Sequence, residues 1–411
     1  PCTDSFFLLL LAMGINVRLS IVGALAFGLC AYNFQILQVG HNSKMVAIAL
    51  MPMVLAGVVY AYRKKAFLGA VLFGFALSFE IAANHSQITF YLGMIILAYV
   101  IAQLVSAIKN KTLPAFIKTS CFVLLATILA AGTNVNRLWP NWEYSKYTMR
   151  GGSELQMAHA QGNQTQGGLN KEYATAWSYG IEETPNLLIP NFNGGASASE
   201  LSKKSKTYEI LKQGGVPNAE QVIKQMPTYW GPQAFTAGPM YMGAISVFLF
   251  VLGLVVLQGT TKWWIAGISL LALLLGWGKH FMWLSSLFFD YVPLYNKFRV
   301  PSMILTILQL TIPLLGFYSL HQIFSDKIEK KRVIKGLKLA LGITGGFCLL
   351  FALLPSLAGS FTSPADSQFP DWLQQALPED RQSMLRSDAF RSLLFILAGA
   401  ATILGGSMKK K

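Results

Sequence analysis

Residues 239–257 read PMYMGAISVFLFVLGLVVL and contain no charged side chain. A helix needs about 20 predominantly apolar residues to cross the ~30 Å hydrocarbon core of a bilayer. A second stretch, residues 303–318 with its flanks, has the same character. Both stretches therefore predict membrane-spanning helices.

The composition of the whole chain agrees with this prediction. Hydrophobic residues make up 53% of the 411 residues and charged residues only 12%, and the mean hydropathy is +0.46, whereas soluble domains carry about 25% charged residues. The net charge of +15 arises from 33 Lys and Arg residues that lie mostly at the ends of apolar runs. This distribution argues against a nucleic-acid partner and for contact with a lipid bilayer.

Apolar runs divided by turn residues and charges predict an all-α polytopic membrane protein with about ten complete spans and a partial one at residues 6–13. Residues 1–132 form the first helices, residues 133–238 a long extracytoplasmic loop region, and residues 239–411 the last helices. A small outer loop is expected at residues 359–388, with a short interfacial helix over residues 371–386. The complete spans are expected near residues 19–37, 45–62, 66–83, 88–108, 114–132, 239–257, 263–277, 302–324, 338–358 and 389–406.

Basic residues assign the two sides of the membrane. When the spans are threaded alternately, the large basic clusters fall on one side, which the positive-inside rule identifies as cytoplasmic. These clusters include Arg63-Lys64-Lys65, Lys109 with Lys111, and the run from Lys327 to Lys338. The polar hinges described next are therefore expected on the extracytoplasmic side.

The first polar hinge is Gly40-His41-Asn42-Ser43-Lys44, between two predicted spans. Gly and Asn are usual in a tight connection, so a simple turn is one reading. The other reading is functional, because Lys44 with Asn42 could hold a phosphate and His41 could donate a proton to a leaving group.

The second hinge contains Glu80, Asn84, His85 and Gln87. An acidic residue at membrane depth costs roughly 2.5–3.5 kcal/mol on insertion scales, so Glu80 is expected to face a polar interior or cavity. A carboxylate that pairs with a basic neighbour to fix helix packing is the alternative.

The third cluster, residues 290–301, reads DYVPLYNKFRVP and precedes a predicted span. Lys297 and Arg299 are cations on the side that the positive-inside rule disfavours. They could clamp a diphosphate or phosphodiester group, or simply contact lipid head groups.

The long loop contains four short sequence motifs, which are WSYG at 177–180, LIPNF at 188–192, YWG at 229–231 and TAGP at 236–239. With the three clusters, in this order, they resemble the YfhO family of bacterial membrane proteins. The resemblance covers nearly the whole chain, up to MLRSDA at residues 384–389.

The resemblance implies a GT-C-type membrane glycosyltransferase in the bacterial cytoplasmic membrane, with its site on the extracytoplasmic side. Such an enzyme would transfer a sugar from a polyprenyl-phosphate-linked donor to a cell-envelope polymer. In this reading His41, His85, Glu80 and Asp290 are candidate catalytic residues. The candidate substrate-binding residues are Asn42, Lys44, Asn84, Gln87, Lys297 and Arg299, together with Trp177, Tyr229 and Trp230, whose rings would stack on sugars.

Two further expectations accompany the resemblance. Members of the family are longer and carry an additional first span and an outer loop with acidic residues, so this chain is expected to be a fragment that is inactive alone. A divalent metal is compatible with GT-C chemistry, but no ligand set can be assigned.

A transporter or flippase of lipid-linked sugars is the alternative function, and a scaffold for envelope assembly is a third.

Overall fold

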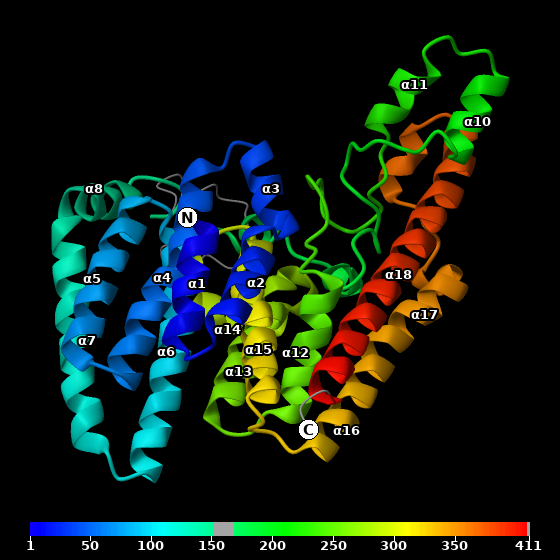
Figure 1. Ribbon diagram of the computed structural model, residues 1–411. Coiled ribbons are helices and arrows are strands. Elements are labelled where there is room, and N and C mark those ends of the chain that lie inside the picture. The colour runs from blue at the N-terminus through cyan, green and yellow to red at the C-terminus, as the bar shows by residue number, and fades with distance from the viewer. Residues whose placement is uncertain (152–167, 409–411) are drawn as a thin grey trace. The chain divides into compact units, whose positions relative to one another are not determined.

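The structure is a computed structural model that describes residues 1–151 and 168–408, whose regular elements are all helices, with no strand among them (Figure 1). They form two compact units. Unit 1 comprises Pro1–Gly28, His41–Tyr179 and Gln258–Leu314, and unit 2 comprises Leu29–Gly40, Gly180–Leu257 and Leu315–Lys411. Each unit is therefore assembled from three separate stretches of sequence.

Seven helical segments of the described chain are long and apolar enough to cross a membrane, which indicates a membrane protein. One of these segments, Val17–Gln38, comprises two helices, α2 (Val17–Gly28) and α3 (Ala31–Gln38). The other six are α4 (Asn42–Arg63), α6 (Ser86–Lys109), α7 (Leu113–Thr133), Pro301–Phe324 with α15 (Thr306–Phe324), Lys330–Leu353 with α16 (Lys330–Ala340) and α17 (Gly346–Leu353), and Asp371–Gly406 within α18 (Asp371–Met408).

The remaining predicted spans are helices that are too short or are bent. The span predicted at 66–83 is α5 (Ala66–Ala82), with 17 residues, and the partial span is α1 (Cys2–Ala12). The span predicted at 263–277 is α13 (Thr260–Gly276), which passes the length test only together with Gly278–Tyr291, and this pair is bent by 109°. Length alone therefore does not yield ten complete spans.

The predicted span at residues 239–257 is wrong at its start. The helix there, α12 (Ala244–Val256), has only 13 residues. Gly243 precedes it with φ +95°, a left-handed conformation that glycine adopts easily but that cannot continue a right-handed helix. Residues 239–243 are consequently not helical, although they are apolar.

In unit 1, α4 and α5 are held at unusually close range by glycines. A Cβ atom at Gly57 would lie 2.6 Å from the Cα atom of Phe73, and one at Gly69 would collide with the backbone of Ala61. Small residues let helix backbones approach in this way within membranes. The contact places α5, which carries Glu80, directly against α4, whose first turn contains Lys44.

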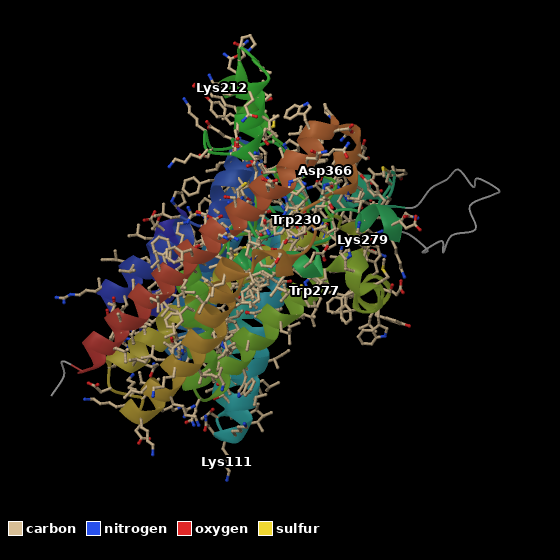
Figure 2. The ribbon with its side chains drawn as sticks, turned by 90° about the vertical axis from the view of Figure 1, so that its right-hand side faces the viewer. Lys111, Lys212, Trp230, Trp277, Lys279 and Asp366 are labelled. Carbon is tan, nitrogen blue, oxygen red and sulfur yellow. The ribbon has the colours of Figure 1, made fainter. Side chains whose placement is uncertain are left out.

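Unit 2 joins apolar helices to a part built from the long loop. Short helices α10 (Lys206–Gln213) and α11 (Ala219–Val222) pack on the N-terminal half of α18 (Figure 1). Their shared core includes Leu211, Ile223, Leu373 and Leu377. Lys212 lies at the tip of α10, away from Trp230 and Asp366 (Figure 2).

The prediction of a separate interfacial helix at residues 371–386 is therefore wrong. These residues are the first turns of α18, which continues without a break to Met408. Their apolar side chains pack against α10 and α11, with Leu377 fully buried. An amphipathic pattern alone does not distinguish protein contact from lipid contact.

Arg381 is the largest completely buried side chain of α18. Its guanidinium pairs with both carboxylate oxygens of Asp366, at 2.6 and 2.9 Å. It also donates to the carbonyl oxygens of Phe361, at 2.7 Å, and Pro227, at 2.6 Å. One side chain thus ties three segments of unit 2 together.

Candidate functional site

Glu80 lies in the last turn of α5 and is completely buried. The Thr89 hydroxyl of α6 donates to Glu80 Oε1 at 3.1 Å, while Glu80 Oε2 is buried without a hydrogen-bond partner among the described residues. A buried carboxylate oxygen without a partner is energetically costly. Buried oxygens of this kind occur at strained positions, at catalytic positions and where a water or ion binds.

A tight turn, Ala83 to His85, connects α5 to α6. Asn84 adopts φ 58°, a left-handed conformation that asparagine tolerates better than most residues. His85 is the N-cap of α6, and its Nδ1 atom accepts a hydrogen bond from the backbone N–H of Ile88 at 3.3 Å. An accepting Nδ1 leaves the proton of the neutral ring on Nε2.

The first and second hinges meet at this end of unit 1. Burial lowers the pKa of His85, and the charges of Lys44 and His41 lower it further. Burial also lowers the pKa of His41, with a second contribution from Lys44. Because the charges of Lys44 and His41 both act on the His85 imidazole, the first and second hinges lie near each other in unit 1. Asn42 is the first residue of α4 and shares its first turn with Lys44.

The third cluster meets the second through its backbone. The Gln87 amide donates to the carbonyl oxygen of Arg299 at 2.7 Å and to the Tyr91 hydroxyl at 2.7 Å. Phe90 packs on the rings of Tyr295 and Phe298, with centroid distances of 6.2 and 5.2 Å. Val300 has φ 60°, which is strained for a β-branched residue.

The charged side chains of the third cluster interact with the long loop instead of with Glu80. Lys171 Nζ lies 2.9 Å from the Asp290 carboxylate. Arg299 donates to the Tyr173 hydroxyl at 2.5 Å and lies over its ring. Lys297 Nζ donates to the Arg150 carbonyl oxygen at 2.5 Å, and burial lowers its pKa. The predicted Lys297 and Arg299 clamp thus has protein acceptors for both cations.

The aromatic residues expected to stack on sugars fall in different units. Trp177 belongs to unit 1, where its carbonyl oxygen accepts a hydrogen bond from Ser302 N at 3.4 Å. Tyr229 and Trp230 belong to unit 2. The Tyr229 hydroxyl donates to Glu183 Oε1 at 2.7 Å, and Trp230 packs on Phe361 with a centroid distance of 5.1 Å.

Glu183 is a buried acid that the sequence motifs did not indicate. It is 1% exposed, and burial raises its pKa. Its carboxylate accepts from Gly180 N at 2.7 Å and from the Gln233 amide at 3.1 Å, in addition to the Tyr229 hydroxyl. These bonds satisfy both oxygens of the Glu183 carboxylate within unit 2, whereas one oxygen of Glu80 has no described partner.

Within residues 1–151 and 168–408, no group of three or more His, Cys, Asp and Glu side chains is arranged to hold a metal ion. No family model, curated protein or solved structure matches the chain. The arrangement at the ends of α4, α5 and α6 combines a buried carboxylate, two imidazoles and a lysine. This combination suits proton transfer beside a bound anion.

Replacement of Lys44 by methionine is expected to raise the pKa of both His85 and His41 toward the ordinary value of 6.5, because a positive charge that disfavours the imidazolium is removed. Both rings should stay neutral at pH 7 in the unmodified protein. NMR titration of selectively labelled histidines would measure the shift. Lys111→Met, at the other end of α6, is the control and should leave both values unchanged. Unchanged titration in Lys44→Met would contradict the convergence of the two hinges.

Proposed function

We propose that this protein is a GT-C-type glycosyltransferase of the bacterial cytoplasmic membrane. It transfers a sugar from a polyprenyl-phosphate-linked donor to a cell-envelope polymer on the extracytoplasmic side. The observation that carries the proposal is Glu80 in unit 1, which is completely buried with one carboxylate oxygen without a described partner. Its other oxygen accepts from Thr89 of α6, the helix that His85 caps.

The chemistry follows from these groups. Glu80 accepts the proton of the acceptor hydroxyl as that oxygen forms a bond to the anomeric carbon of the sugar. The bond between the anomeric carbon and the phosphate oxygen breaks, and the polyprenyl phosphate leaves with the electron pair. Lys44 stabilises the charge on the departing phosphate, and a neutral His41 or His85 relays the proton from the site to solvent.

The proposed sidedness rests on the ends of the same helices. Arg63, Lys64 and Lys65 lie at the junction of α4 and α5, and Lys109 and Lys111 at the junction of α6 and α7. These junctions are at the opposite ends of the helices from Lys44 and His85. Lys111 lies at the end of unit 1 opposite to Lys279 (Figure 2). Basic residues concentrate on the cytoplasmic side, so the Lys44 end faces outward.

The function can be tested with the full natural polypeptide in proteoliposomes, given a radiolabelled polyprenyl-phosphate sugar and isolated envelope polymer. Label should appear in the polymer. Lys44→Met should weaken the apparent donor affinity by about tenfold or more, the value of a lost charge-assisted hydrogen bond. Lys111→Met should transfer as the unmodified protein does.

The same assay distinguishes sugar transfer from the alternative function, transport of the lipid-linked sugar. A flippase would carry the labelled lipid across the bilayer without placing label in the polymer, and this outcome would replace the proposal. Transport would be read from the protection of the lipid-linked sugar against an added impermeant oxidant. Label in neither place would contradict both functions.

A further inference from the structure

The helix α8 (Val135–Ser145) lies directly beyond the end of α7 in unit 1. Asn134 separates the two helices, and its amide donates to the carbonyl oxygen of Ser78 at 3.0 Å and to the Ser78 hydroxyl at 3.1 Å. These bonds fix the junction against α5. Figure 1 shows α8 running across the ends of α5 and α7.

The polar face of α8 is attached to the protein. Arg137 and Asn141 are four residues apart and so lie on the same side of the helix. Arg137 donates to the carbonyl oxygen of Ala82, and the Asn141 amide donates to Asn84 Oδ1 at 3.0 Å. Ala82 is the last residue of α5, and Asn84 belongs to the turn that carries His85.

The apolar face of α8 points away from that turn. Val135, Leu138, Trp139 and Trp142 follow the i, i+3, i+4, i+7 spacing of one helix face. Their exposed fractions are 57%, 38%, 66% and 55%, and no residue of α8 is buried by any other described residue. A helix on the surface of a soluble protein has the reverse arrangement, because burying one large apolar side chain contributes about 1.5–3 kcal/mol.

The exposed face continues the apolar surface of a membrane-length helix. On α7, Leu124, Leu125, Ile128 and Leu129 are between 54% and 62% exposed, as expected for side chains that contact lipid. This surface leads to Val135 within two turns. Trp residues are enriched where the hydrocarbon meets water, because their rings are apolar and their N–H group is polar.

We propose that α8 is a membrane-surface helix, which lies in the head-group region of the bilayer with Val135, Leu138, Trp139 and Trp142 directed into the lipid. Its polar face holds the Asn84–His85 turn, so the turn is fixed relative to the membrane surface. The occupant of the apolar face is the phospholipid interface, not another segment of protein. The inference depends on α7 crossing the membrane and is independent of sugar transfer.

Spin labels at single cysteines test this placement in nanodiscs of phosphatidylcholine and phosphatidylglycerol. The four native cysteines, Cys2, Cys30, Cys121 and Cys348, are first replaced by alanine. Labels at Trp139→Cys and Trp142→Cys should collide frequently with oxygen and rarely with a water-soluble nickel chelate. They should report positions about 5–10 Å below the head-group surface.

Two controls define the scale. Asn136→Cys places a label on the side of the same helix, exposed but polar, and should collide with the nickel chelate several-fold more often. Lys212→Cys on α10 provides the aqueous limit. If replacing a tryptophan prevents folding, Val135→Cys reports on the same face.

Two outcomes would overturn the proposal. Labels at 139 and 142 that collide with nickel as often as the label at 212 would place α8 in water. Labels protected from both oxygen and nickel would show that protein covers this face.

Discussion

Replacement of Arg381 by methionine is expected to destabilise unit 2 by about 3–5 kcal/mol, the usual cost of removing one partner from a buried ion pair. Asp366, itself 7% exposed, would lose both of its bonds to the guanidinium. Backbone oxygens of Phe361, Pro227, Thr228 and Tyr229 would lose a donor as well. Methionine fills much of the volume but satisfies none of these acceptors.

Pulse proteolysis in urea, with the protein in nanodiscs, would measure this loss as a lower urea midpoint. Lys203→Met is the control, because Lys203 forms an ion pair with Glu220 in which both side chains are more than half exposed. Exposed pairs contribute little, so the midpoint should not change measurably. The double variant Arg381→Met/Asp366→Leu should be less destabilised than Arg381→Met, since no buried charge is left alone. Equal midpoints for Arg381→Met and Lys203→Met would show that the buried pair does not support unit 2.

Replacement of Glu80 by glutamine is expected to lower the turnover of the proposed sugar transfer by about 10²–10⁴-fold, the usual contribution of a positioned general base. Glutamine has nearly the same shape and can still accept the Thr89 hydrogen bond, but it cannot take a proton. Donor affinity should therefore change little, and the loss should appear in kcat.

The measurement is the proteoliposome transfer assay with the full natural polypeptide, run at several donor concentrations. Glu209→Gln is the matched control, because Glu209 is an exposed acid on α10 that pairs with Lys206. Its turnover should equal that of the unmodified protein. Gel filtration would confirm that Glu80→Gln is folded. Full turnover in the folded Glu80→Gln protein would remove Glu80 from the chemistry and leave it a packing role.

The sequence predicts the helices well because apolar length is a local property. Each predicted span falls on one helix or on consecutive helices, such as α2 with α3, but the ends differ where backbone geometry intervenes. Gly243 delays α12, and the 109° bend after α13 leaves the span predicted at 263–277 too short to pass the length test on its own. Whether a helix continues through a polar stretch is equally difficult to predict from hydropathy, because α18 runs unbroken from Asp371 to Met408.

The candidate site was partly predictable for a related reason. Alternate threading of the helices places the hinges at 40–44 and 84–87 at the same end, and the electrostatic effect of Lys44 on His85 agrees. The partners of Lys297 and Arg299 were not predictable, because they come from residues more than 120 positions away. Arg381 likewise gave no signal, since a charge in an amphipathic segment normally faces water.

The segments of the two units alternate along the chain, and this order determines when each unit can be completed during synthesis. Translation adds about 5–20 residues each second, and domains generally fold as units. Unit 1 requires Gln258–Leu314, so its helices α4 to α7 must wait in the membrane while the first parts of unit 2 are inserted. The bond from Gln87 to Arg299 spans 212 positions and is a late step. A ribosome that stalls before residue 299 would therefore leave α5 and α6 formed but without the carbonyl oxygen that accepts the Gln87 hydrogen bond.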